Sequence, residues 1–214
     1  MHPPTSQPWC KICGLTVEAD VVAAINAGVD ALGFNFFPRS ARYLSPEKAA
    51  TLCRVAREMG PSVERIGLFV DAPADQVKDV IAGVDLSMLQ FHGDESVAYC
   101  EQFDLPYIKV VGVTKTTDFQ ALQADFASAW ALLLDTHDPV QKGGTGRRFD
   151  WSLWPDKSRG RLVLAGGLDP SNVAEALQLT QAFGVDVAGG VEGSIRGVKD
   201  HDKLQTFIEA AKHG

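Results

Sequence analysis

Short apolar runs alternate with longer amphipathic runs along almost the whole chain, and this alternation limits the possible folds more than any other feature. The segment 129–134 is apolar at every position, as expected of a strand buried on both faces of a parallel sheet. The longer runs space their apolar residues as one face of a helix requires. Strands are therefore predicted at 8–13, 30–36, 64–70, 86–91, 106–111, 130–135, 161–165 and 184–188.

Helices are predicted between these strands, at 17–27, 46–59, 73–83, 94–103, 117–127, 170–181 and 200–212, with a short turn in 149–158. Ser45 before Pro46, and Asp169 before Pro170, are typical of an N-cap followed by a proline in the first helical turn. Gly28 follows the apolar stripe of the first helix and predicts its end.

Strands that alternate with helices form either a closed (β/α)8 barrel or a doubly wound open sheet. The segment 14–16 lacks the glycine-rich turn of a dinucleotide-binding sheet, which disfavours the open form. Polar or glycine residues follow nearly every strand, as in a barrel whose site is built from all strand ends. We therefore predict an α/β fold, a single (β/α)8 TIM barrel over 9–214, after a loose polar extension at 1–8.

Composition excludes several classes of function. The chain has 214 residues with a formal net charge of -7 and no Lys/Arg run, so neither nucleic acid nor an anionic membrane is an expected partner. No apolar run approaches the ~18 residues of a membrane span. The first eight residues lack the apolar core of a signal peptide, and a cytoplasmic protein is expected.

The first strand ends at a thiol and a glycine, in the segment 11–16. Lys11 and Cys13 share one face of this strand because side chains alternate. The same alternation places Cys10 and Cys13 on opposite faces, so that they share neither a metal nor a disulfide. Cys53 and Cys100 lie in helical runs, where we interpret them as small core residues.

Asp135 ends the sixth strand and faces the same barrel mouth as Cys13. A carboxyl and a thiol across one mouth can form a general acid/base pair, although Asp in this position is often a turn residue. Arg42 is suited to bind carboxylate or phosphate. His92 is a possible base, or a structural residue, with no second ligand spaced for a metal site.

Glycine turns follow the last two strands, at Gly166-Gly167 and Gly189-Gly190. Converging backbone N–H groups bind anions, and barrels often hold phosphate at these two loops, although ordinary turns have the same composition. A further glycine-rich segment, 143–146, contains Gly144 and suggests a flap. The residues alone thus predict a (β/α)8 enzyme that acts on a small phosphorylated anion by proton transfer, without a metal.

Several motifs in register resemble the phosphoribosylanthranilate isomerase family of tryptophan biosynthesis. They cover residues 9 to about 208 and lie at 11–16, 33–43, 67–70, 89–95, 133–136, 143–146, 149–151, 165–168, 184–187 and 190–192. The resemblance implies an Amadori rearrangement of N-(5-phosphoribosyl)anthranilate with no metal or organic cofactor. A monomer and a homodimer are both compatible with it.

The resemblance also implies roles for individual residues. Asp135 is the general acid and Cys13 the general base, while Arg42 engages the anthranilate side of the substrate. The four glycines of the two late turns hold the phosphate through their backbone. The matched motifs add further substrate-binding residues, namely Lys11, His92, Gly144 and Asp186. As a hypothesis, Lys11 also favours ionisation of the Cys13 thiol.

The chain departs from the family pattern after the last strand, where 188–190 reads Ala-Gly-Gly instead of Ser-Ser-Gly. Both hydroxyl groups are lost, which leaves the backbone N–H groups to bind phosphate. Alternative interpretations are the indole-glycerol-phosphate synthase barrel, a bifunctional isomerase that also serves histidine synthesis, and a degenerate barrel that only binds a metabolite or protein. The synthase is disfavoured because it would need a longer N-terminal region and a catalytic lysine–glutamate set, and Cys13 with Asp135 disfavours the degenerate barrel.

Overall fold

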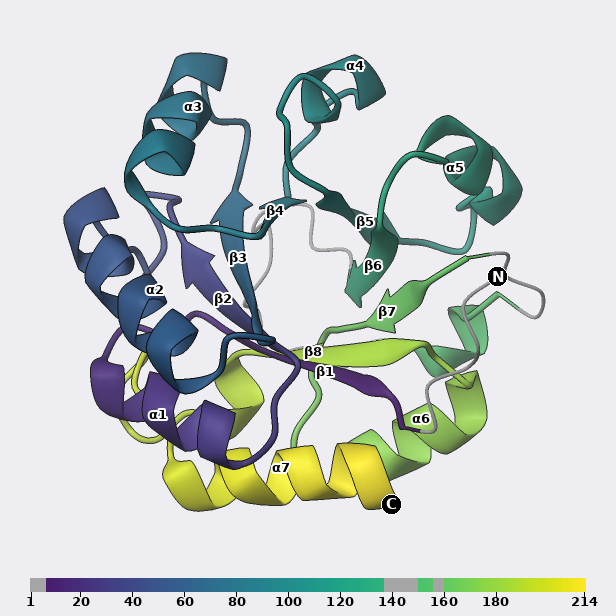
Figure 1. Ribbon diagram of the computed structural model, residues 1–214. Coiled ribbons are helices and arrows are strands. Elements are labelled where there is room, and N and C mark those ends of the chain that lie inside the picture. Colours follow the sequence, from purple (N-terminus) through teal and green to yellow (C-terminus); the bar gives the residue numbers. More distant parts are fainter. Residues whose placement is uncertain (1–6, 137–149, 156–159) are drawn as a thin grey trace.

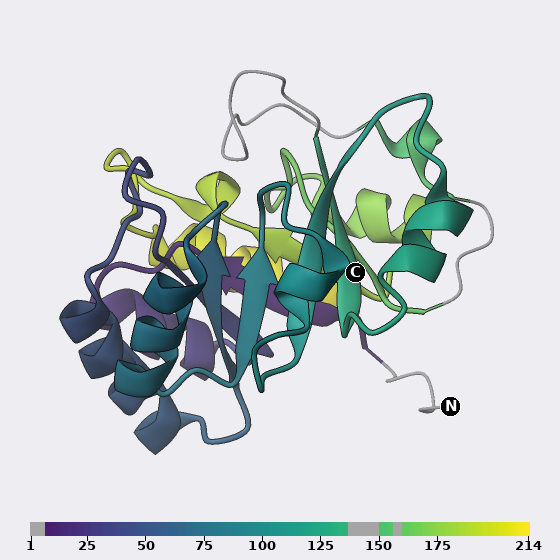
Figure 2. The same cartoon turned by 90° about the horizontal axis from the view of Figure 1, so that it is seen from above.

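The computed structural model describes residues 7–136, 150–155 and 160–214, and these form a closed barrel of parallel strands (Figures 1 and 2). The strands follow one another around the ring in sequence order, and the last pairs with the first. They are β1 (Trp9–Cys13), β2 (Ala31–Asn35), β3 (Glu64–Phe69), β4 (Met88–Phe91), β5 (Tyr107–Val113), β6 (Ala131–Thr136), β7 (Leu162–Leu164) and β8 (Gly184–Val187). The predicted TIM barrel is confirmed.

The helices lie around the outside of the barrel (Figure 1). They are α1 (Glu18–Asn26), α2 (Pro46–Met59), α3 (Ala74–Gly83), α4 (Val97–Cys100), α5 (Phe119–Asp125), α6 (Val173–Thr180) and α7 (His201–His213). Two 3-10 turns, η1 (Trp151–Leu153) and η2 (Gly189–Val191), complete the described elements. In the described part of the chain, no helix has the length and apolar character needed to cross a membrane.

Local sequence signals explain several helix boundaries. The Ser45 side chain accepts a hydrogen bond from the backbone of Lys48, and Pro46 opens α2 as predicted. Gly28 follows α1 with a φ of 84°, a conformation that favours glycine. The prediction that Pro170 opens a helix is wrong, because α6 begins only at Val173. Asp169 instead caps the turn that leads directly into α6: its carboxylate accepts hydrogen bonds from Ser171, and its carbonyl accepts one from Val173 N–H at 3.2 Å.

Strand alternation separates the core into two layers. Cys10 and Ile12 point outward into the large cluster between barrel and helices, whereas Trp9 belongs to the smaller cluster inside the barrel. Cys13 packs at the mouth with Leu68 and Val70. This confirms that the two cysteines of the first strand face opposite ways, and it sends the Lys11 side chain into the interior, where it is fully buried.

The predicted N-terminal extension lies largely outside the described residues, which begin at Gln7. The Gln7 amide nitrogen lies 3.3 Å from the Nδ1 atom of His213 near the C-terminus. A loose extension at 1–8 therefore stays a prediction. The remaining cysteines follow expectation, since Cys53 in α2 and Cys100 in α4 are buried free thiols.

Candidate active site

A buried cation, a thiol and a carboxylate meet at the junction of β1 and β8. Lys11 and Asp186 are paired in register, and the Lys11 Nζ atom donates to Asp186 Oδ1 at 2.9 Å. Cys13 also acts electrostatically on Lys11 and raises the pKa of its ammonium group. Gly33 on β2 makes room for both, because a Cβ atom there would lie 2.9 Å from Cys13 Sγ and 3.1 Å from Lys11 Cε. Gly33 begins the motif 33–43 but was not among the predicted site residues.

Opposing effects act on the Cys13 thiol. Burial raises its pKa and Asp186 adds to that rise, whereas the positive charges of Lys11 and Lys199 lower it. Burial prevails, so the pKa of Cys13 lies above the ordinary 9.0. For Lys11, burial opposes the charged form, but Asp186 and Cys13 together raise its pKa, and the ammonium stays protonated.

Asp135, near the end of β6, has a different environment. Its Oδ1 atom accepts a hydrogen bond from the Thr136 backbone at 2.7 Å, and its Oδ2 atom lies 3.6 Å from His92 Nε2. Burial raises the pKa of Asp135 to about 6. Gly166 makes this packing possible, because a Cβ atom there would lie 2.8 Å from Asp135 Oδ1. The structure thus brings His92 to Asp135 rather than to a metal-binding cluster.

The two glycine turns after β7 and β8 lie against each other. Gly166 and Gly167 have φ values of 87° and 66°, and Gly190 is so close to the Leu168 carbonyl that a Cβ atom would lie 1.9 Å from its oxygen. Such contact requires glycine at position 190. Asn172 fixes the first turn, donating to the Gly167 carbonyl at 3.0 Å. Both turns lie at the mouth as predicted, whereas no motif pointed to Asn172.

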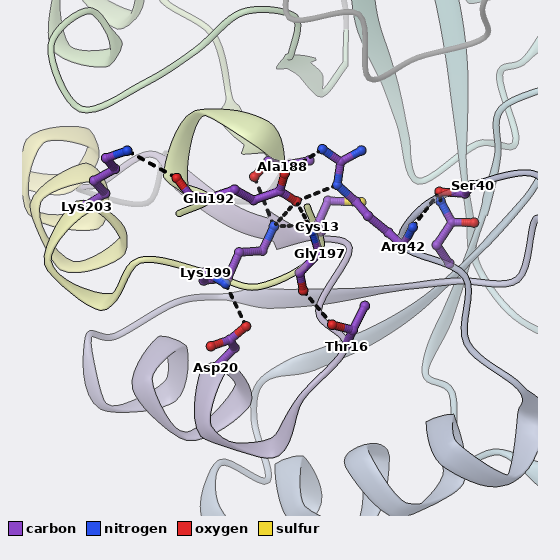
Figure 3. A network of polar contacts seen from close by, with 11 residues as sticks. Cys13, Thr16, Asp20, Ser40, Arg42, Ala188, Glu192, Gly197, Lys199 and Lys203 are labelled. Carbon is purple, nitrogen blue, oxygen red and sulfur yellow. Dashed lines mark hydrogen bonds and ion pairs between the residues drawn. The ribbon is translucent and has the colours of Figure 1, made fainter. Parts of the chain in front are cut away.

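Arg42 is held by a carboxylate that was not among the predicted site residues. Its Nε and Nη2 atoms donate to the two oxygens of Glu192 at 2.6 and 2.8 Å, a two-pronged ion pair (Figure 3). The stem of Arg42 passes over Gly14, where a Cβ atom would lie 2.3 Å from Arg42 Cδ. Lys199 completes the group, 3.3 Å from Glu192. The sequence signal that could have pointed to Lys199 is its position directly before Asp200, the N-cap residue of α7.

One predicted site residue, Gly144, lies outside the described residues, as does its glycine-rich segment 143–146. The other predicted positions lie inside the barrel, at the carboxyl ends of strands or in the segments that follow those ends. Within 7–136, 150–155 and 160–214, no group of three or more His, Cys, Asp or Glu side chains is arranged to hold a metal ion.

Comparisons with known proteins give one consistent result. Residues 10–210 match the protein family described as N-(5'phosphoribosyl)anthranilate (PRA) isomerase. A relative of that name from Cellvibrio japonicus is 48% identical over 201 residues, which cover 94% of this chain and 92% of the relative. Another, from Thiobacillus denitrificans, is 47% identical over 202 residues, covering 94% and 97%.

Solved structures agree with these relatives. Phosphoribosyl anthranilate isomerase from Thermotoga maritima superposes with a TM-score of 0.85 at 39% identity, covering 95% of this chain and 98% of that one. A structure of the same kind of enzyme in complex with reduced 1-(o-carboxyphenylamino)-1-deoxyribulose 5-phosphate gives a TM-score of 0.81 at 37% identity, with the same coverage.

Proposed function

Because the chain belongs to the N-(5'-phosphoribosyl)anthranilate isomerase family, we propose that it converts N-(5-phosphoribosyl)anthranilate into 1-(2-carboxyphenylamino)-1-deoxyribulose 5-phosphate by an Amadori rearrangement. One observation carries the assignment of roles: a carboxyl with a raised pKa and a thiol beside buried lysines share one barrel mouth. The reaction needs an acid at the ring oxygen and a base at C2 of the sugar.

The acid step is assigned to Asp135. Its proton passes to the ribose ring oxygen, the C1–O bond breaks, and the nitrogen lone pair forms the C=N bond of a protonated Schiff base. With a pKa of about 6, roughly a tenth of Asp135 is protonated at pH 7, compared with less than one part in a thousand for an ordinary aspartate. Burial therefore makes this carboxyl a usable acid at neutral pH.

The base step is assigned to Cys13. Its thiolate takes the proton from C2, the electron pair of that C–H bond forms the C1=C2 bond, and the π pair of the C=N bond returns to nitrogen, which neutralises it. The resulting enolamine then tautomerises to the ketone. The protonated Schiff base is a cation, so ring opening acidifies C2 and stabilises the adjacent thiolate at the moment it is needed. Lys11 and Lys199 act in the same direction.

The substrate's two anionic ends have separate partners in this proposal. Backbone N–H groups of the two glycine turns, at Gly166, Gly167, Gly189 and Gly190, receive the phosphate. Arg42 receives the anthranilate carboxylate. Its Nε and Nη2 atoms are used by Glu192, and the other edge of the guanidinium group is the one assigned to the substrate. A solved relative binds a reduced form of the product, which is itself a phosphorylated anion.

The expected cytoplasmic location, and a monomer or homodimer as the working form, stay part of this proposal. Among the solved relatives, the phosphoribosylanthranilate isomerase of Thermotoga maritima is a dimeric enzyme.

The test is an anthranilate-fluorescence assay that follows the loss of substrate. Cys13→Ala and Asp135→Asn are each expected to lower kcat by roughly 10²- to 10⁴-fold. Cys53→Ala, which removes a buried thiol in α2 far from the mouth, serves as the control and should keep kcat. Near-full turnover by either of the first two variants contradicts the assignment of roles.

A further inference from the structure

The Lys199 ammonium group lies under the mouth, with no exposed side-chain surface. Its Nζ atom donates to the carbonyl oxygens of Cys13 at 2.8 Å and Ala188 at 2.9 Å, and to Glu192 Oε1 at 3.3 Å (Figure 3). An ammonium group has three protons, and these three acceptors can use all of them. One of them belongs to the last residue of β1 and another directly follows β8. Lys199 thus ties two neighbouring strand ends together at the position of the thiol.

Glu192 extends this contact to Arg42. Its Oε1 atom accepts from Lys199, from Arg42 Nε and from the Gly197 backbone at 3.1 Å, while its Oε2 atom accepts from Arg42 Nη2. Two cations therefore share one buried carboxylate, which leaves a net positive charge beside the end of β1. Burial opposes ionisation of Glu192, but Arg42 and Lys199 lower its pKa below the ordinary value, so it stays charged.

The backbone of Lys199 is fixed as firmly as its ammonium group. Its N–H group donates to Asp20 Oδ2 at 2.8 Å, and His201 Nε2 lies 2.9 Å from the other oxygen of that buried carboxylate. The backbones of Lys199 and Glu192 also pair in an isolated antiparallel β-bridge, and Asp200, the next residue, caps α7. Lys199 is therefore anchored both at its backbone and at its ammonium group.

We propose that Lys199 is a positioning residue for both ends of the reaction: it fixes the end of β1 that carries Cys13, supplies positive charge to that thiol, and orients Arg42 through Glu192. The effect on turnover rests on the proposed function above. The effect on the thiol itself does not, because ionisation of Cys13 is measurable without substrate.

Several charged groups face Cys13, and the experiment must separate the effect of Lys199 on the thiol pKa from the effects of the others. Lys11 on β1 and Lys199 before α7 favour the thiolate, Asp186 on β8 opposes it, and the positive charge of Arg42 interacts with it. Lys11 remains in place in a Lys199 variant, so the thiol pKa is expected to shift without losing all cationic support.

The experiment measures the rate at which iodoacetamide alkylates Cys13 as a function of pH, with the Cys13→Ala protein as the blank for the three other thiols. Lys199→Met is expected to raise the Cys13 pKa by about one unit, which slows alkylation roughly tenfold at any pH below it. Lys199→Arg, which keeps the charge, should restore most of the rate. Lys199→Gln, neutral but able to donate hydrogen bonds, replaces the Met variant if that protein does not fold.

Lys109→Met is the matched control. Lys109 is also buried, 2.9 Å from Glu95, and it also donates to a carbonyl beyond a strand end, that of Gly93 at 2.7 Å. It should leave the Cys13 pKa unchanged. An unchanged thiol pKa in Lys199→Met, or an equal shift in Lys109→Met, overturns the inference. Should Cys13→Ala instead keep its turnover, the assignment of Cys13 as the base fails, and the role of Lys199 toward the thiol is still tested.

Discussion

The two reactive groups of the barrel mouth have opposite surroundings. Cys13 lies on a cationic side, near Lys11, Lys199 and Arg42, and these charges work against the burial that keeps it protonated. Asp135 lies where burial dominates, and its pKa rises to about 6. In the proposed mechanism this contrast serves the chemistry: burial makes the carboxyl a better acid at neutral pH, while the nearby cations limit the rise that burial causes in the thiol pKa.

The same contrast separates the two buried Lys–Glu pairs. Lys109 and Glu95 hold the segment after β4, since Glu95 also accepts hydrogen bonds from the backbone of Asp71 and Gly93. Lys199 and Glu192 hold a strand end as well, but the positive charge of Lys199 also lowers the pKa of the Cys13 thiol. A buried ion pair can thus serve architecture alone or architecture and chemistry together.

The largest expected effect concerns the cost of burying Asp135. Its pKa is 3.8 when unperturbed and about 6 in the fold, so the unfolded chain loses its proton first as the pH rises. Stability therefore falls between about pH 4 and 6, and the full cost, about 3 kcal/mol, is present at neutral pH. Asp135→Asn should be more stable than the parent by up to that amount at pH 7.5, and the gain should shrink toward pH 4.

Urea denaturation at the two pH values checks this, with the exposed helical substitution Asp79→Asn as the control. An Asp135→Asn protein that is no more stable than the parent at pH 7.5 means that burial does not raise the pKa of this carboxyl.

The pH profile of the reaction tests both environments together. In the proposed mechanism the active form has Asp135 protonated and Cys13 ionised, although Asp135 has the lower pKa of the two. From about pH 6 up to the thiol pKa, the loss of acid and the gain of base cancel, so kcat/KM should be flat. Below pH 6 it should fall tenfold per unit, to roughly a hundredth of the plateau at pH 4.

The Asp135→Asn protein is the control for this profile. The substrate phosphate also titrates near pH 6. A change of slope near pH 6 that is due to the phosphate persists in the Asp135→Asn protein, whereas a change of slope that is due to Asp135 disappears. If kcat/KM instead falls as the pH rises above 6, Cys13 is ionised at a lower pH than its environment predicts.

The Lys11–Asp186 pair acts on both reactive groups in opposite directions. Lys11 lowers the pKa of Cys13 more than Asp186 raises it, while for Asp135 the rise due to Asp186 is the larger of the two effects. Removing both in Lys11→Met/Asp186→Asn should raise the thiol pKa and lower the carboxyl pKa, so the active form becomes rarer. We expect kcat/KM at pH 7.5 to fall roughly tenfold, with the alkaline limb displaced upward.

The pair Lys212→Met/Asp30→Asn is the matched control, because it removes a 2.9 Å ion pair before β2, at the opposite end of the barrel. Equal losses in the two double variants would mean that the Lys11–Asp186 pair contributes only stability.

The smallest expected effect concerns the phosphate turn after β8. A Cβ atom at Gly189 meets only the Nη2 atom of Arg42, at 3.4 Å, so a serine fits. Gly189→Ser restores a hydroxyl of the family pattern and should lower KM by a factor of about three to ten, the value of one net hydrogen bond. Gly190→Ala is the contrasting variant, since its Cβ atom collides with the Leu168 carbonyl. A KM that does not fall in Gly189→Ser places the phosphate elsewhere.

The sequence by itself determined the barrel, because apolar alternation is a local property that each strand and helix carries alone. Strand parity likewise put Lys11 and Cys13 on one face and Cys10 on the other, and strand ends placed Asp135 and the glycine turns at the mouth. The structure showed which of the two faces is the inner one. The predicted helix start at Pro170 failed by three residues because Asp169 caps a turn that precedes the first regular turn of α6.

Only the tertiary structure decided the protonation states and the partners. Whether a carboxyl titrates near 4 or near 6 depends on its burial by other strands, and Arg42 meets Glu192 across 150 positions of sequence. Lys199 likewise reaches Cys13 from the far end of the chain. A local pattern cannot contain such contacts, because they exist only once the barrel has closed and β8 lies beside β1.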